Sequence, residues 1–470
     1  MTARRGNERR DAGPHSCVIN PRMKDAQVGS LSLGGKYGRM FPNLPALETN
    51  VESVLGLGRA ALSMDATLPM MDEALENPRI PAGFAILGQF VAHDITADRS
   101  LLAPHEELEE LRNARVPRLD LECVYGDGPV GNPFLYDADD PDKLLLGVDR
   151  AGDPAEDLPR NHQGMALVGD PRNDVHLLIS QLHLAFLKLH NRVVDWMQGR
   201  GVPDDDVFDE ACRLVKWHYE WIVAHEFLEL TVGEELLADI ESNGRRFYEP
   251  DERAGRTPEI PVEFSDAAYR FGHAQIWPTY RLNDTSGEAT IFPDCLGGRR
   301  VPPERAIDWS FFFNSSDRRT PQPSRKIVPS LSQALTDLPE QIVGHTEIPE
   351  HHSLAVRDLQ RGAALELPSG EAVARAIGVE PLTAEECGLC AGGWEGETPL
   401  WYYVFKEAEV RVGGEYLGPV GGRIVAEVLL GLLDADPGSY RQVEPAWRPE
   451  LPSAQPGRFT MSDLLRLTKV

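Results

Sequence analysis

The stretch Ile86-Leu-Gly-Gln-Phe-Val-Ala-His-Asp-Ile-Thr96 places three polar side chains in an otherwise apolar run. Gln89 and His93 are four residues apart, so on a helix they lie on the same face. Asp94 is turned about 100° away from His93 and can bind something else. A base and an amide donor that face one cavity favour a buried reaction centre. A single histidine on an apolar helix is, however, more often a packed core residue.

Two downstream segments favour the reaction centre. Tyr269-Arg-Phe-Gly-His-Ala-Gln-Ile-Trp-Pro278 carries a second histidine in an aromatic, apolar setting. Gly169-Asp-Pro-Arg-Asn173 carries an arginine at the start of a long amphipathic run. Three further segments complete the pattern: Leu119-Asp-Leu-Glu-Cys-Val-Tyr-Gly126, Pro399-Leu-Trp-Tyr-Tyr-Val-Phe-Lys-Glu-Ala-Glu409 and Leu417-Gly-Pro-Val-Gly-Gly-Arg-Ile-Val-Ala-Glu427. Together these segments resemble the animal-type heme peroxidases of the peroxidase–cyclooxygenase superfamily, in the form found in bacteria.

The resemblance runs from about Gly34 to the C-terminus. It implies a mainly α-helical heme peroxidase domain over residues 34–470, with heme between a distal and a proximal helix. Residues 1–33 are polar and without periodicity, so we expect an N-terminal arm or tail.

Helical periodicity agrees with a mainly α fold. The expected helices are Val175 to Met197, Leu214 to Leu230, Leu354 to Leu365 and Trp401 to Leu433, the last broken at Gly413-Gly414 and Gly421-Gly422. Ile307 to Pro329 is typical of an irregular surface excursion. His176, His183 and His190 recur every seventh residue, which is two turns rather than the one turn that metal ligands need, so we expect packing and hydrogen-bonding roles.

The composition narrows the functional class. The 470-residue chain carries a formal net charge of −27, which disfavours nucleic acids and anionic membranes as partners. No segment approaches the roughly 18 apolar residues that span a bilayer. Met1 to Arg10 is basic with no apolar stretch behind it, so it is not a usable secretory signal, and a cytoplasmic location is the simplest expectation.

The number of cysteines is also consistent with a cytoplasmic location, because six cysteines in a chain of this length do not form a disulfide framework. Cys387 and Cys390 resemble a redox pair or half a zinc site. No second pair follows at zinc spacing, so we expect free thiols in a loop.

Peroxide cleavage at a heme iron needs an axial ligand, a base that moves the peroxide proton, a cation and a pocket that excludes bulk water. The resemblance assigns these roles to His273 as iron ligand, His93 as distal acid–base and Arg172 as cation. Gln89 would donate a hydrogen bond to a distal water or a bound halide.

Three of these roles have plain structural alternatives. His273 can be a buried structural histidine. Arg172 can be an ordinary partner of Asp170 or Asp174 near a helix start. Gln89 can make a passive amide hydrogen bond.

The segment Val356-Arg-Asp-Leu-Gln-Arg-Gly362 resembles the family segment whose Asn contacts the proximal histidine. This chain has Asp358 at that place. A carboxylate that accepts the histidine N–H stabilises higher iron oxidation states, so the ferric form should be harder to reduce. Arg361 would reach a heme propionate. Solvated helix charges are the alternative for both residues.

Two departures from the family concern how the heme is held. Many members carry an Asp just before the distal His and a Glu three residues after the Arg, and these esterify the heme. This chain has Ala92 and Val175 there. Neither side chain can form an ester, so we expect non-covalent heme b, a less oxidising heme, and poor oxidation of chloride.

Calcium is a second expected cofactor. Asp94 follows the distal His as in the family's calcium site, and Val116-Pro-Arg-Leu-Asp-Leu-Glu122 resembles its second half. Asp120 and Glu122 offer carboxylates, and the main-chain carbonyls of Val116 and Arg118 add oxygens. The family usually has Thr where this chain has Val116, so one side-chain ligand is missing. Solvated loop acids are the alternative.

The expected function is a heme peroxidase in which hydrogen peroxide yields a ferryl intermediate that oxidises small aromatic or inorganic donors. One alternative is a fatty-acid dioxygenase of the cyclooxygenase branch, but this chain has Arg270 where those enzymes carry a radical tyrosine. Another is a dedicated biosynthetic heme oxidase with one organic substrate. A heme-binding scaffold is disfavoured, because a scaffold has no need of Gln89, His93 and Arg172.

Overall fold

A computed structural model describes residues 35–49, 52–58, 72–97, 108–149, 151–250, 257–315, 319–389 and 394–469. The expected arm over residues 1–33 and the thiol of Cys390 fall outside these ranges.

The described chain is mainly α-helical, as predicted. The longer helices are α2 (Gly83–Ile95), α5 (Leu177–Gly199), α6 (Val207–Ile222), α7 (Leu228–Val232), α8 (Glu234–Asn243), α12 (Leu354–Ala364), α13 (Gly370–Ile377), α15 (Leu400–Val412), α16 (Pro419–Ala435) and α18 (Met461–Leu467). Single-turn helices are α3 (Glu122–Tyr125), α4 (Gly128–Gly131), α9 (Val262–Ser265), α10 (Gln333–Thr336), α11 (Glu340–Val343), α14 (Ala384–Cys387) and α17 (Tyr440–Val443).

Three small sheets tie distant segments together. In the first, β1 (Gly35–Gly38) lies between β3 (Arg112–Asn113, antiparallel) and β4 (Glu259–Pro261, parallel). In the second, β2 (Glu76–Pro81) pairs antiparallel with β7 (Pro323–Arg325). In the third, β5 (Thr279–Arg281) pairs antiparallel with β6 (Glu288–Thr290).

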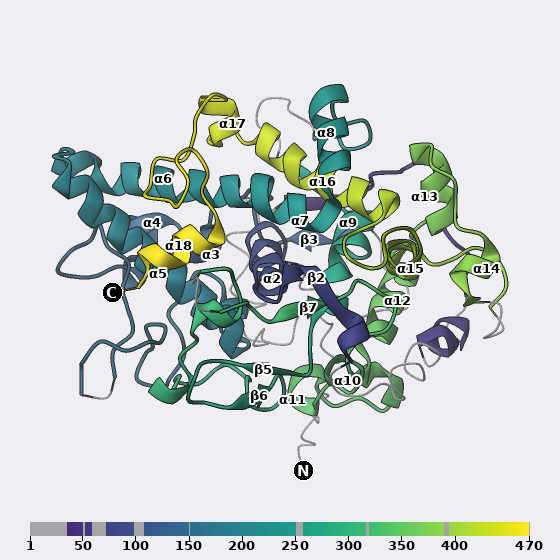
Figure 1. The fold of residues 1–470 in the computed structure, drawn as a ribbon, viewed down its shortest axis with the longest axis horizontal. Coiled ribbons are helices and arrows are strands. Elements are labelled where there is room, and N and C mark those ends of the chain that lie inside the picture. The colour runs from purple at the N-terminus through teal and green to yellow at the C-terminus, as the bar shows by residue number, and fades with distance from the viewer. Residues whose placement is uncertain are drawn as a thin grey trace, which may run out of the picture.

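Helix α2 lies near the centre of the molecule, with α5 and α6 on one side and α12 and α15 on the other (Figure 1). It packs against α5, where the Phe90 ring stacks on Phe186 with centroids 4.7 Å apart. It also contacts η9, a 3-10 helix over Ala268–Gln275. The central helix also contacts the 3-10 turn Pro171–Asp174, so it joins the two segments that carry the predicted arginine and the second histidine.

The predicted helix from Leu214 to Leu230 is confirmed. It is one continuous helical run in which a π-helical turn, Val223–Phe227, joins α6 to α7. The helices predicted from Val175 and from Leu354 are confirmed as α5 and α12.

The prediction that Gly421-Gly422 interrupts a helix was wrong, because both glycines lie inside α16. A Cβ on Gly421 would meet Val404 at 2.7 Å, and one on Gly422 would meet Leu236 at 2.8 Å. These glycines allow neighbouring helices to approach closely. The real break follows α15, where Gly413 and Gly414 have positive φ.

The prediction of a surface excursion over Ile307 to Pro329 was also wrong in part. The backbone is irregular, but Phe312, Phe313 and Ile327 are almost fully buried. Phe313 packs edge-on against Phe84 in the first turn of α2. The proline-rich pattern reflects irregular backbone rather than exposure.

Cys387 is buried at the end of α14 and forms no disulfide. Among the described residues, none of the helices has the length and apolar character that crossing a membrane requires.

Candidate active site

A cavity of about 250 Å³ lies between α2, the start of α5, η9 and α12. Its wall includes Gln89, His93, Arg172 and His273. These four residues come from three segments of the chain, and the fold brings them to one cavity as the sequence predicted. Most of the remaining wall is apolar, including Phe84, Ile86, Phe264, Phe271, Ile276, Leu335, Leu338 and Ile342.

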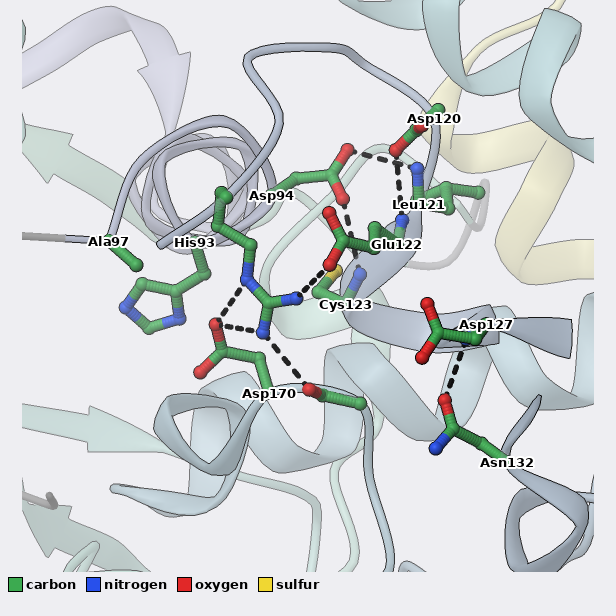
Figure 2. Close-up of polar contacts among 12 residues, drawn as sticks. His93, Asp94, Ala97, Asp120, Leu121, Glu122, Cys123, Asp127, Asn132 and Asp170 are labelled. Atoms are coloured by element: carbon green, nitrogen blue, oxygen red, sulfur yellow. Dashed lines mark hydrogen bonds and ion pairs between the residues drawn. The ribbon is translucent and has the colours of Figure 1, made fainter. Parts of the chain in front are cut away.

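Helix α2 separates two groups of polar side chains. Gln89 and His93 face the cavity, whereas Asp94 is fully buried on another side of the helix, as Figure 2 shows for His93 and Asp94. The Asp94 carboxylate accepts the backbone N–H groups of Leu121, at 3.0 Å, and Cys123, at 3.4 Å. The predicted division of the helix into two faces is confirmed.

His93 is held by a chain of hydrogen bonds. Its Nδ1 lies 2.8 Å from Oδ1 of Asn173, and Nδ2 of Asn173 lies 3.0 Å from Nδ1 of His183. With the amide oxygen facing it, Nδ1 carries the proton and Nε2 keeps its lone pair. Burial, with the nearby Arg172 guanidinium, lowers the pKa of His93 to about 3. The ring is therefore a neutral base near pH 7.

Arg172 lies in the 3-10 turn Pro171–Asp174, which Asp170 caps by accepting the Arg172 backbone N–H. The Arg172 guanidinium pairs with Asp170, and Nη2 donates to the carbonyls of His93 at 2.9 Å and Thr96 at 2.7 Å. It thus satisfies carbonyls at the C-terminal end of α2. Among the described residues, Nη1 has no hydrogen-bond partner. Arg172 is therefore both a partner of Asp170 and a residue of the cavity wall.

Asp170 joins this turn to a second arginine. Its carboxylate also accepts from Nε of Arg115 at 3.0 Å. Burial raises the pKa of Asp170, but Arg172 and Arg115 outweigh that effect and hold it well below its usual range. Asp170 therefore stays ionised between the two guanidinium groups.

The three evenly spaced histidines make hydrogen bonds, as predicted, but one of them also reaches the cavity. His190 contacts the Tyr125 hydroxyl and the carbonyl of Asp142. His176 lies in the cavity wall, with Nε2 2.7 Å from Oε1 of Gln89.

On the opposite wall, Nδ1 of His273 lies 2.7 Å from Oδ2 of Asp358, in the middle of α12. The other carboxylate oxygen accepts from Arg270, which also pairs with Asp266 at 2.6 Å. Burial raises the pKa of Asp358, but His273 and Arg270 outweigh it and leave the pKa below its usual value. The predicted contact between Asp358 and His273 is thus present in the geometry.

The residues that line this cavity suit a heme. Because Asp358 holds Nδ1 of His273, Nε2 is the nitrogen that remains for a metal. A Cβ added to the cavity-lining Gly272 would meet no atom within 4 Å, so a flat ring can lie against this backbone. Ala92 and Val175 line the same cavity, so the positions expected for ester links carry only aliphatic side chains.

Arg361 does not belong to the cavity wall. Its Nε lies 3.5 Å from the carboxylate of Asp266, and the side chain is almost fully buried. Arg357, one turn earlier on α12, lines the cavity instead and donates to the carbonyl of His351 at 3.2 Å. The contact of Arg361 with a propionate stays a prediction.

The carboxylates expected to bind calcium already have partners. Glu122 accepts from Arg115 at 2.9 Å, and Asp120 accepts the backbone N–H of Glu122 at 3.1 Å (Figure 2). The carbonyl of Val116 accepts the backbone N–H of Arg118 at 2.8 Å. Within the described ranges, no group of three or more His, Cys, Asp or Glu side chains is arranged to hold a metal ion.

Sequence reasoning missed Asn173, His176 and Arg357. Asn173 directly follows the predicted arginine, and Arg357 directly precedes Asp358, so adjacency was the available signal. His176 was recognised only as one of three evenly spaced histidines. Nothing in its spacing separates it from His183 and His190.

Comparisons with known proteins find peroxidases among the similar sequences. A sequence profile described as Animal haem peroxidase matches residues 105–294, which contain Arg172 and His273. The chain is 24% identical over 314 residues to chorion peroxidase of Aedes aegypti, which covers 63% of this chain and 37% of that protein. It is 28% identical to human thyroid peroxidase over 138 residues, which covers 28% of this chain and 14% of that protein. The chain spans about a third of the length of the first curated relatives that it matches.

Solved structures extend the likeness to most of the chain. Peroxidase A from Dictyostelium discoideum matches with a TM-score of 0.61 at 15% identity, over 87% of this chain and 88% of that one. A fatty acid alpha-dioxygenase from Arabidopsis thaliana matches with a TM-score of 0.59 at 16% identity, over 86% and 72%. The chain therefore resembles animal haem peroxidases in sequence over residues 105–294, and it shares the fold of these two solved structures over most of its length. The expected bacterial form stays a prediction.

Proposed function

We propose that this protein is a heme-dependent peroxidase that uses hydrogen peroxide to oxidise small aromatic or inorganic donors. The observation that carries the proposal is the pair of histidines in the wall of one cavity. His93 and His273 each have Nδ1 fixed by a neighbour, Asn173 or Asp358, which leaves each Nε2 for chemistry in the cavity. Two histidines with purely structural roles would not need to present a free Nε2 to the same cavity.

His273 would hold the heme iron through Nε2, and the apolar wall would enclose the ring. Arg357 is a cation in the cavity wall that suits a propionate. Heme b would be held without ester links, because Ala92 and Val175 offer no carboxylate. The bound heme supplies a redox-active iron; the remaining chemistry belongs to the residues of the chain.

His93 would accept a proton from bound hydrogen peroxide at Nε2 and return it to the departing oxygen. Its low pKa keeps the ring neutral and ready at pH 7. Arg172 would stabilise negative charge on that oxygen, with Nη1 as the donor that has no other partner among the described residues. Gln89 would donate a hydrogen bond within the same cavity.

A fatty-acid dioxygenase of the cyclooxygenase branch is the second candidate. The fold likeness to a plant fatty acid alpha-dioxygenase and the apolar cavity wall favour it. Against it, Arg270 stands where a radical tyrosine is expected and is tied to Asp358 and Asp266. Tyr269 lines the cavity, but its hydroxyl donates to the Gly88 carbonyl at 3.2 Å. We therefore favour the peroxidase.

The deciding experiment is an absorption spectrum of the purified, heme-supplemented protein, with acid–acetone extraction of one sample and hydrogen peroxide added to another. We expect a Soret band that leaves with the solvent and shifts with peroxide. Heme that stays with the protein would overturn non-covalent binding, and the lack of any Soret band would overturn the proposed function. Oxygen uptake with a long-chain fatty acid, without peroxide, would favour the dioxygenase. Oxidation of one organic donor but not of common phenols would favour a dedicated biosynthetic oxidase.

Calcium is proposed only at Asp94 and the nearby Asp120. Burial, together with the nearby Asp120, raises the pKa of Asp94 to about 7. A divalent cation between these carboxylates would offset both effects. Removing calcium with a chelator should lower the melting temperature, and adding calcium should restore it. An unchanged melting temperature would leave Asp94 as a partner of backbone N–H groups alone.

A further inference from the structure

His176 is fixed in one tautomer by the start of α5. It is the N-cap residue of this helix, and its Nδ1 accepts the backbone N–H of Ile179 at 3.3 Å. A backbone N–H can only donate, so Nδ1 must be the unprotonated nitrogen. In the neutral ring the proton is then on Nε2.

That proton decides which way the Gln89 amide is turned. Nε2 of His176 lies 2.7 Å from Oε1 of Gln89, and its N–H can donate only to the oxygen of the amide. The amide oxygen of Gln89 is therefore taken by His176, and its NH2 group is the end left for the cavity that both residues line. Without this contact either end of the amide could face the cavity.

The backbone around His176 is held from both directions. The Leu177 N–H donates to the Cys295 carbonyl at 2.7 Å, and the Gly297 N–H donates to the Val175 carbonyl at 2.9 Å. Burial lowers the pKa of His176 to about 4, so the ring stays neutral near pH 7. Both the position and the tautomer of the ring are thus set by the fold.

We propose that His176 is a positioning residue that holds Gln89 with its NH2 group toward the cavity, making Gln89 a hydrogen-bond donor to an anionic or lone-pair ligand. The inference rests on the proposed heme-binding function. It predicts that His176 affects ligand binding only through Gln89.

The test is fluoride binding to the heme-loaded ferric protein, followed by absorption, because fluoride accepts hydrogen bonds and undergoes no redox step. His176→Phe and Gln89→Ala should each weaken fluoride about tenfold, the usual range for a hydrogen bond to a charged group. The double variant should be no weaker than Gln89→Ala alone. Additive losses, or unchanged affinity in His176→Phe, would overturn the proposal.

His176→Asn is the matched control for helix capping. Asn is a good N-cap residue, so it should keep the melting temperature, but its shorter side chain cannot reach Gln89. It should therefore weaken fluoride as His176→Phe does. Normal fluoride affinity in His176→Asn would show that capping alone mattered and would overturn the proposal. If the wild-type protein binds no heme, the proposed function fails instead, which separates the two ideas.

Discussion

The two walls of the cavity fix their histidines with different chemistry. On the α2 wall, His93 is hydrogen-bonded to the Asn173 amide, which is in turn hydrogen-bonded to the neutral ring of His183. On the η9 wall, His273 is hydrogen-bonded to the Asp358 carboxylate, which is in turn paired with Arg270. Both partners orient a ring, but only Asp358 carries a charge. After these partners of the two histidines, the η9 side is called the charged wall and the α2 side the neutral wall.

The difference matches two separate tasks. A base that must accept a proton and release it again works best when its partner favours neither form strongly, and an amide meets that need. A metal ligand works best when its partner increases the electron density on the ring, and a carboxylate does this. The predictions that follow test whether this division of roles is real, from the largest expected effect to the smallest.

Removing the ligand on the charged wall should have the largest effect. His273→Ala deletes the nitrogen proposed to bind iron, so heme retention should fall to near zero. The ratio of Soret absorbance to protein absorbance after gel filtration measures this. His345→Ala changes an exposed histidine and should keep the wild-type ratio. Full retention of heme in His273→Ala would show that His273 is not the iron ligand, and the two walls could then not be contrasted as ligand and base.

Removing the base on the neutral wall should leave heme bound but slow the chemistry. His93→Ala should lower the rate of reaction with hydrogen peroxide by about 10²- to 10⁴-fold, the usual contribution of a general base. Stopped-flow absorption of the heme-loaded variant measures the rate. A rate close to that of the wild type would reject His93 as the base.

Replacing the carboxylate by an amide should make the two walls alike. Asp358→Asn should make the ferric form easier to reduce and weaken heme retention by roughly 10- to 100-fold, as for other groups that support a metal ligand. Spectroelectrochemical titration gives the potential. A potential that becomes more negative would contradict the role given to Asp358.

The reverse exchange adds a charge to the neutral wall. In Asn173→Asp the carboxylate would favour the protonated form of His93 and raise its pKa from the present value of about 3. The peroxide reaction should then slow as the pH falls through that raised pKa, whereas the wild-type rate should stay flat down to about pH 4. Rate profiles between pH 4 and 8 provide the measurement. Identical profiles would show that Asn173 does not set the state of His93.

Acid should destabilise the fold, because it protonates buried histidines that are neutral in the folded protein. Burial lowers the pKa of His183, His190 and His218 to about 4. The unfolded chain takes up these protons near pH 6.5, so the stability they contribute is complete above pH 6.5 and is lost as the pH falls toward 4. The slope is about 1.4 kcal/mol per pH unit for each histidine. The melting temperature of the wild type should fall as the pH is lowered from 8 to 4. In His218→Gln the fall should be less steep, because one fewer proton is taken up on unfolding. A melting temperature of the wild type that does not change with pH would contradict this prediction.

The sequence by itself determined the helical class and the local chemistry. The spacing of Gln89 and His93 places them on one face of a helix whatever surrounds it, because 3.6 residues complete a turn. The missing carboxylates at Ala92 and Val175 are likewise a matter of residue identity alone.

Only the tertiary structure decided which neighbours act together. His176 contacts Gln89 across 87 positions of sequence, and Asp358 contacts His273 across 85. The sequence could not show that Arg357 rather than Arg361 faces the cavity, or that Arg115 takes a carboxylate expected to bind calcium. Such contacts depend on how helices are packed and rotated against one another, which is set by the sum of many distant apolar contacts and not by the local pattern.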